Sequence, residues 1–136
     1  MLSVFDVAKY ILDTIGEIST MKLQKLCYYS QAWSLAWTDK RLIKENFYRW
    51  DNGPVCVELF EIHKGMFYIN SDYLKEKARQ DLSTEQKRIV DQIIEDYGKY
   101  TGAQLSELTH KEDPWLKTEK DKIIPVETIK NFYKNA

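Results

Sequence analysis

The apolar positions of this chain recur mainly at the three- and four-residue spacing of helices. The first apolar stripe covers residues 4–15. Ser3 and Asp6 have the spacing of a capping box at its start, and Gly16 follows it as a stop signal. The pattern predicts an amphipathic helix that packs one face against a core.

The longest helical pattern begins at a cap on Ser19 or Thr20 and continues to about Trp37. Apolar side chains surround nearly all of it, which is typical of a helix at the centre of a domain. Trp33 and Trp37 lie one turn apart on this helix. We expect them in the core rather than in a stack that binds a cofactor.

A short strand is predicted between the helical patterns. Residues 47–50 combine large aromatic side chains with an arginine and lead into a turn at 51–54. Pro54 suits the first position of a third helix, which we expect to begin there. Residues 71–78 fit one more helix, and residues 122–124 are a candidate second strand.

The second half of the chain carries two further helix starts. Capping boxes at 83–86 and 101–104 begin two helices, of which the first ends at Gly98 and the second is terminated or redirected by Pro114. Pro125 opens a last helix. Together these elements predict a mainly α fold, a compact single-domain helical bundle of about five to six helices with a small two-stranded β element.

Composition limits the class of protein. The chain has 136 residues and a mass of 16.2 kDa, which suits one domain over residues 1–136. Its net charge of −1 provides no overall positive field for nucleic acid. One basic stretch interleaved with aromatics leaves a local nucleic-acid surface as an alternative, but solvated lysines beside a buried face are the favoured interpretation. Its members are Lys22, Lys25, Lys40, Arg41, Lys44 and Arg49.

Two features predict a reduced, cytoplasmic protein. The first residues carry neither the cationic region nor the apolar run of a signal peptide, and Cys27 and Cys56 lack paired spacing. Charged or amide side chains interrupt every apolar run within a few residues, so we expect no contact with a membrane.

An acid/base site is one interpretation of the segment around His110. Glu112 or Asp113 could orient this histidine, with Cys27, Cys56 or a tyrosine as nucleophile. No nucleophile stands in an elbow motif, and a histidine just after a helix end more often donates hydrogen bonds to free carbonyls. The structural interpretation is favoured, so we predict no catalytic residue.

The sequence predicts neither a metal site nor a cofactor. Cys27, Cys56, His63 and His110 are suitable zinc ligands, but no pair has the close spacing that makes such sites specific. Cys56 and His63 lie two helical turns apart, roughly 10 Å by helix rise. The glycines are scattered and form no phosphate-binding loop.

Three segments carry a resemblance to a known family. They are Met21 to Trp33 (MKLQKLCYYSQAW), Trp50 to Val55 (WDNGPV) and Leu105 to Trp115 (LSELTHKEDPW). In this order they resemble the Panacea domain family, the SocA-like and GepA-like group of phage-associated proteins. The chain departs from the family pattern at Val57 and Phe60, where proline and tyrosine are frequent. The family pattern therefore does not predict the geometry at the start of the third helix.

The resemblance implies a compact helical domain that acts as the antitoxin of a type II toxin-antitoxin pair. Such a domain neutralises a cognate protein toxin, which we expect an adjacent gene to encode, by direct contact. One relative instead passes its toxin to a ClpXP-type protease, so a proteolytic adaptor with a AAA+ protease as partner is an alternative. A DNA-binding autoregulator is a further alternative.

Under this interpretation four residues are candidate anchors for the partner: Tyr48, Arg49, Trp50 and Trp115. Trp50 and Trp115 each neighbour a proline turn, which can hold an aromatic exposed for a partner or pack it onto the core. The other motif residues are assigned to holding the fold. They are Lys25, Leu26, Trp33, Gly53, Pro54, Val55, Thr109, His110, Asp113 and Pro114.

Overall fold

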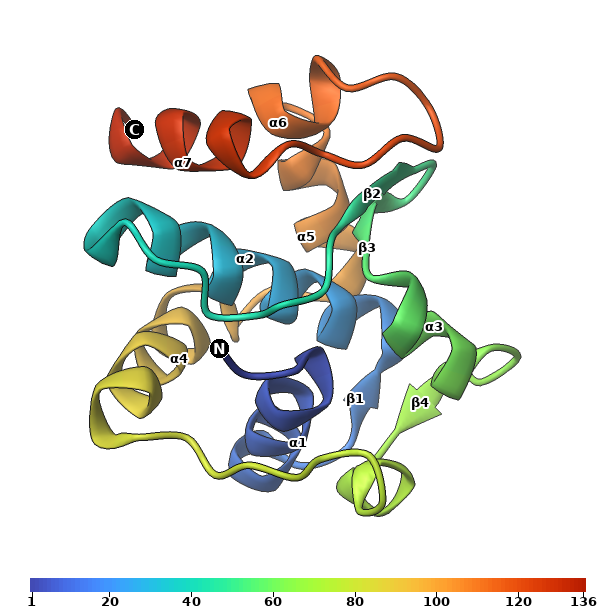
Figure 1. Ribbon diagram of the computed structural model, residues 1–136. Helices are drawn as coiled ribbons and strands as arrows, with labels where there is room; N and C mark the ends of the chain where they lie inside the picture. The colour runs from blue at the N-terminus through green and yellow to red at the C-terminus, as the bar shows by residue number, and fades with distance from the viewer.

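The computed structural model describes residues 1–136 as seven α-helices, one 3-10 helix and two antiparallel sheets of two strands each (Figure 1). The elements are α1 (Val4–Ile15), β1 (Ile18–Ser19), α2 (Thr20–Thr38), β2 (Tyr48–Trp50), β3 (Gly53–Val55), α3 (Val57–His63), β4 (Tyr68–Ile69), η1 (Ser71–Leu74), α4 (Thr84–Tyr97), α5 (Gly102–Thr109), α6 (Asp113–Leu116) and α7 (Val126–Lys134). The predicted mainly α fold is confirmed. None of the helices combines the length and the apolar character needed to cross a membrane.

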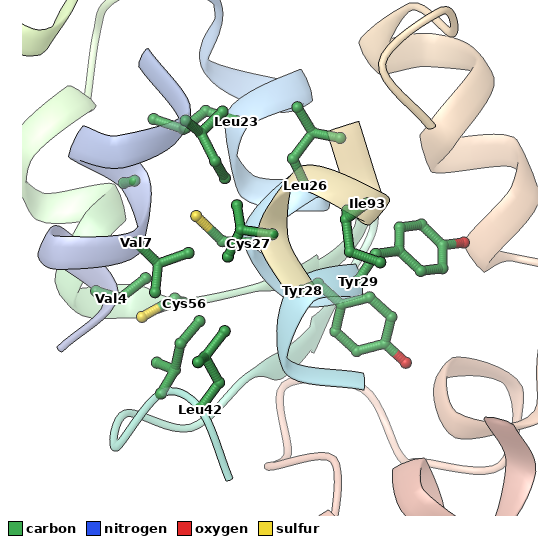
Figure 2. Close-up of a cluster of buried hydrophobic side chains, with 14 of the residues drawn as sticks. Val4, Val7, Leu23, Leu26, Cys27, Tyr28, Tyr29, Leu42, Cys56 and Ile93 are labelled. Carbon is green, nitrogen blue, oxygen red and sulfur yellow. The ribbon is translucent and has the colours of Figure 1, made fainter. Parts of the chain in front are cut away.

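Helix α2 forms the centre of the molecule, as its apolar pattern predicts. It packs against α1, α4, α5 and α7 and against strand β3. Every residue from Leu23 to Ala32 is buried, and because this run exceeds two helical turns, no side of that part of α2 faces solvent. Figure 2 shows the core around it, where Val4 and Val7 of α1, Cys56 and Ile93 of α4 gather next to α2.

The prediction that both tryptophans of α2 are core residues is wrong for Trp37. Trp33 is half-buried, and its Nε1 donates a hydrogen bond of 2.9 Å to the Tyr97 hydroxyl. Trp37 is 48% exposed because it lies in the last turn of α2, where neighbouring positions are no longer fully covered. Its ring packs on that of Trp33, with 5.3 Å between the ring centroids.

The helix starts follow the local capping chemistry that the sequence predicts. Ser3, Ser83 and Thr101 each complete a capping box with the side chain three residues later. Ser19 caps α2 through a hydrogen bond of 3.1 Å from the Lys22 amide to its hydroxyl. These interactions lie within four residues of sequence, which is why the pattern alone located them.

Two predictions based on proline are wrong. Pro54 does not open α3 but lies in β3, paired with Arg49 of β2, and α3 begins at Val57 after Cys56. An edge strand tolerates proline because its missing N–H faces away from the ladder. Pro114 does not end the helix after 101–104, since α5 ends at Thr109; instead it stands in the first turn of the short helix α6.

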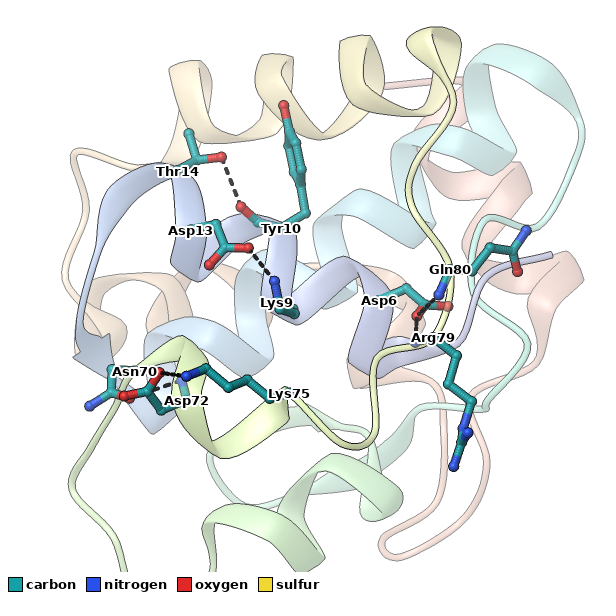
Figure 3. A network of polar contacts seen from close by, with 10 residues as sticks. All are labelled: Asp6, Lys9, Tyr10, Asp13, Thr14, Asn70, Asp72, Lys75, Arg79 and Gln80. Atoms are coloured by element: carbon teal, nitrogen blue, oxygen red, sulfur yellow. Dashed lines mark hydrogen bonds and ion pairs between the residues drawn. The ribbon is translucent and has the colours of Figure 1, made fainter.

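Segment 71–78 forms a 3-10 helix only over Ser71–Leu74, and a turn follows at 75–77. Residues 78–82 then run without regular secondary structure as a strap across α1. Asp6 of α1 holds the strap, since its Oδ1 accepts hydrogen bonds from the amides of Arg79 (2.8 Å) and Gln80 (3.0 Å) (Figure 3). Burial would raise the pKa of Asp6, but its hydrogen bonds to backbone amides and Ser3 outweigh burial and hold it below the usual value.

Segment 122–124 is a single bridge rather than a second strand. Ile123 pairs with Tyr48, and the Ile124 amide donates to the Phe47 carbonyl at 2.8 Å. The small sheet beside it is made by β2 and β3 instead, because the chain reverses at Asp51 and Asn52 and Gly53 then pairs with Trp50.

Candidate functional site

The three segments that carry the family resemblance meet at Gly53. This residue has a φ of 112°, a backbone conformation that disfavours side chains. A Cβ added there would also lie 2.6 Å from Cε of Lys25 and 2.7 Å from Oγ1 of Thr109. Both the turn and the close approach therefore require glycine, and α2, the β2–β3 hairpin and α5 pack into one junction.

Side-chain hydrogen bonds from α2, α5 and α6 hold the hairpin in place. Nζ of Lys25 donates to the Pro54 carbonyl at 3.2 Å. The Ser106 hydroxyl donates to the Asn52 carbonyl at 2.7 Å, and Nε1 of Trp115 donates to the Trp50 carbonyl at 2.9 Å. All the acceptors are backbone atoms, so the hairpin keeps its position whatever its side chains contact.

Lys25 is buried to 1% exposure at this junction, which contradicts its interpretation as a solvated lysine. It forms no ion pair, and the Pro54 carbonyl accepts its one side-chain hydrogen bond. Burial lowers the pKa of Lys25 to about 7. The sequence contained a signal for this burial. A helix that is apolar on all sides is surrounded by other elements, which also cover the lysine that it carries.

Gln24 connects α2 to the start and the end of α3. Its Oε1 accepts from the Cys56 amide at 2.9 Å, and its Nε2 donates to the Cys56 carbonyl at 3.0 Å. This fixes the orientation of the amide, so the contact of 3.0 Å to Nε2 of His63 makes that ring nitrogen the acceptor. His63 is thus neutral, and burial lowers its pKa.

A cavity of about 400 Å³ opens between the first turns of α2, the β2–β3 hairpin and α3. We call it the Lys25 pocket. Gln24, Lys25 and His63 are its buried polar members, and the rings of Trp50 and Phe60 meet edge to face at 4.9 Å between centroids. The remaining lining residues are Thr20, Met21, Asp51, Asn52, Val55, Lys120 and Asp121.

Three of the four candidate anchors lie together beside this pocket. The Arg49 guanidinium carbon is 3.9 Å from the ring centroid of Trp115, and Nε1 of Trp115 donates its hydrogen bond to the Trp50 carbonyl. Arg49 also donates to the Thr118 carbonyl at 2.6 Å. Tyr48 lies at the other end of β2, against Ile123. All four anchors are half-buried.

The sequence suggested that the ring of His110 donates a hydrogen bond to a helix carbonyl, but it does not. It lies against the Trp115 ring at 4.2 Å between centroids, and its buried Nε2 has no hydrogen-bond partner. Only the backbone amide of His110 caps α5, through the Ser106 carbonyl at 3.2 Å. Aromatic stacking with Trp115 replaces the expected capping role.

The acid/base arrangement considered from the sequence is not assembled. Glu112 forms no hydrogen bond with His110; its Oε1 accepts hydrogen bonds from the hydroxyls of Tyr29 (2.7 Å) and Tyr133 (2.8 Å). Burial raises the pKa of Glu112, against a lowering effect of the two hydroxyls. Asp113 instead pairs with Lys117 on the surface.

The two cysteines are equally unsuited to that arrangement. Burial raises the pKa of Cys27 far above its usual value, and it raises the pKa of Cys56 to about 12. Nowhere do three His, Cys, Asp or Glu side chains gather closely enough to hold a metal ion.

Sequence reasoning missed a second aromatic group near β4. Phe67, Tyr68 and Tyr73 are 73%, 58% and 55% exposed, and the first two rings contact each other at 4.9 Å between centroids. The Phe67 carbonyl accepts from the Thr20 amide at the rim of the Lys25 pocket. The elements α6, β2–β3, α3 and β4 follow one another along one side of the molecule (Figure 1).

Comparison with known proteins matches the part of the chain that contains nearly all of the three segments. The family model described as "Antitoxin SocA-like, Panacea domain" matches residues 23–116, which include nearly all of the junction. No match was found among curated proteins or among solved structures. Since the match covers more than half of the chain, this protein belongs to the SocA-like antitoxin family with the Panacea domain.

Proposed function

We propose that this chain is the antitoxin of a type II toxin-antitoxin pair and neutralises a protein toxin by direct contact. Family membership supports an antitoxin with a protein partner. The observation that carries the proposal is the cluster of Arg49, Trp50 and Trp115, which is half exposed yet fixed by hydrogen bonds to backbone carbonyls.

The composition of this cluster suits a protein interface. Tryptophan, tyrosine and arginine are the residues that most often dominate binding energy, and a standard interface buries roughly 800 Å² on each partner. Because the Arg49 and Trp115 side chains already contact each other, less side-chain entropy is lost when a partner binds. We place the centre of the toxin contact here.

The exposed aromatics near β4 extend this surface. Phe67, Tyr68 and Tyr73 expose more than half of their area without an intramolecular partner large enough to cover them. Since their elements continue along the same side as the hairpin, one toxin molecule can reach both groups. We assign them to the periphery of the same interface.

Expression of the neighbouring gene tests the proposal. We expect the neighbouring product alone to arrest growth, and this chain to restore growth and to copurify with it. Trp115→Ala should weaken the complex by about tenfold or more, the usual cost of losing a tryptophan at an interface centre. Trp37→Ala is the matched control, since Trp37 is exposed on the far end of α2. A neighbour that is harmless, or that is neutralised without forming a complex, would contradict the proposal.

The same assay separates sequestration from delivery to a protease. Sequestration predicts that growth is restored equally in cells lacking the ClpXP-type protease, and that the toxin persists as a stable complex. Restoration that requires the protease, together with loss of the toxin, would replace sequestration by the adaptor role. The surface proposed for toxin contact applies to both outcomes.

A further inference from the structure

We propose that the Lys25 pocket binds a small carboxylic acid, with the carboxylate paired to the Lys25 ammonium and the apolar part of the acid lying against Trp50 and Phe60. This ligand site shares Trp50 with the surface proposed for toxin contact, and it is inferred from the free chain alone. It does not rest on the proposed function.

The unpaired Lys25 ammonium is the first argument. It has three N–H donors and a single acceptor, the Pro54 carbonyl, and no carboxylate lies within ion-pair distance. A buried ammonium without a counter-ion is costly, and a carboxylate entering the pocket would supply both the charge and the missing acceptors.

The charge around the pocket selects a ligand with one negative charge. His63 is neutral because its Nε2 accepts from Gln24, so Lys25 is the one buried cation. The rim holds Asp51, paired with Lys120 at 3.6 Å, and Asp121. A phosphate with two negative charges would be repelled by these acids and would have only the Lys25 ammonium to balance it. The single charge of a carboxylate is balanced by this ammonium.

The first turn of α2 adds to this preference. Thr20 and Met21 line the pocket and belong to the amino end of a helix of 19 residues, where the helix dipole favours an anion. Together with the buried lysine, this end of α2 gives the pocket a positive base under an acidic rim.

The size and walls of the pocket define the rest of the ligand. A cavity of about 400 Å³ lies in the range for small-molecule sites. Met21, Trp50, Val55 and Phe60 give it apolar walls, and the Trp50 ring offers a flat surface for stacking. An aromatic or short aliphatic acid fits these walls.

Titration calorimetry with matched acids and amides is the direct test. Acetate, benzoate and indole-3-acetate would each be compared with the corresponding amide at pH 6.5. We expect at least one acid to bind about tenfold or more tightly than its amide, because only the acid brings a negative charge that forms an ion pair with the Lys25 ammonium. Equal binding of acid and amide, or binding of none, would overturn the proposal.

Two lysine variants identify the responsible cation. Lys25→Met should reduce binding of that acid by about tenfold or more, whereas Lys120→Met, at the exposed rim, should change it less than about twofold because surface charges are screened by solvent. The reverse result would move the site to the rim and refute a buried carboxylate.

A measurement on the unmodified chain covers the case in which Lys25→Met does not fold. The carbon-13 signal of Lys25 Cε reports its protonation during a pH titration. Binding of the acid should move its midpoint upward, and binding should weaken between pH 6 and 9 as the amine loses its proton. The other titratable groups at the pocket are Asp51, His63, Lys120 and Asp121. An unchanged Lys25 midpoint in the presence of bound acid would exclude the proposed contact.

Discussion

Two ionisable groups, the half-buried Glu112 that contacts α2 and the buried Lys25 within this helix, differ in how their hydrogen-bonding capacity is used. Glu112 lies in a closed cluster where the hydroxyls of Tyr29 and Tyr133 donate to the same carboxylate oxygen, while the Tyr28 hydroxyl contacts that of Tyr133 at 3.2 Å. Lys25 has one carbonyl and borders an open pocket. The first group has its partners within the chain, and the second lacks them.

This difference separates a structural from a functional use of buried charge. A satisfied polar cluster fixes the arrangement of a core, and its removal leaves other groups unpaired. An unsatisfied charge beside a cavity raises the free energy of the free protein, and a ligand can relieve that cost. The following predictions test whether the two groups behave in these two ways.

The largest effect is expected from Gly53→Ala, which disturbs the junction around Lys25. The methyl group would meet Lys25 and Thr109 at less than 3 Å in a backbone conformation with positive φ. Strain and overpacking together should lower the free energy of unfolding by about 3 kcal/mol, measured by urea denaturation. Gly16→Ala is the control for backbone strain alone, since it has a positive φ and no atom within 4 Å of the added group. Equal losses would show that packing at Gly53 contributes nothing.

A smaller loss is expected from Glu112→Ala. The hydroxyls of Tyr29 and Tyr133 would lose their acceptor inside the core, at a cost of about 2 to 3 kcal/mol in the same measurement. Glu112→Gln keeps a carbonyl acceptor and should lose less than half as much. If both variants are as stable as the original chain, the cluster does not hold α6 and α7 to α2.

The pH dependence of stability should reveal Lys25. Its pKa is about 7 in the folded chain, against 10.5 for an exposed lysine, so the unfolded chain binds more protons between these two pH values. Stability from Lys25 therefore rises as pH increases above 7. The difference in unfolding free energy between the original chain and Lys25→Met isolates this contribution from the buried tyrosines. A flat difference between pH 7 and 9 would show that Lys25 is not desolvated.

The smallest effect is expected from Lys25→Met at neutral pH. An apolar side chain of similar length removes the desolvation cost and leaves only the Pro54 carbonyl unpaired. The melting temperature should stay within a few degrees, corresponding to about 1 kcal/mol or less. A loss as large as that of Glu112→Ala would place Lys25 among the structural groups and remove the contrast between the two sites.

The parts of the fold that the sequence predicted depend on neighbouring residues. Capping boxes at Ser3, Ser83 and Thr101 and the apolar stripe of α2 are encoded within a few positions, and these elements appear where expected. The pattern misplaced Pro54 because this residue pairs with Arg49 in the hairpin and its carbonyl accepts from Lys25, which is distant in sequence and close in space. Local propensity contains no information about that approach.

The sequence predicted the candidate site only in part, because its contacts also join residues that are distant in sequence. Arg49 and Trp115 were selected by residue type, but their contact depends on how α6 turns back over β2. His63 and Gln24 gave no signal, since their relation arises from the packing of α3 on α2. The family motif assigns Lys25 to holding the fold, whereas the charge pattern assigns it to a solvated face because lysine is rarely buried. The enclosure of its helix outweighs that preference for solvent.

The strap over residues 78–82 also divides the chain into two parts. It is the covalent link between a first half that ends with η1 and a second half that begins with α4, and Asp6 holds it through two backbone amides. The halves meet chiefly around α2, which packs against α4, α5 and α7. Two separately expressed fragments, broken within the strap, should therefore reassemble around α2, and the strap is the place where this protein can be split to report on its own assembly.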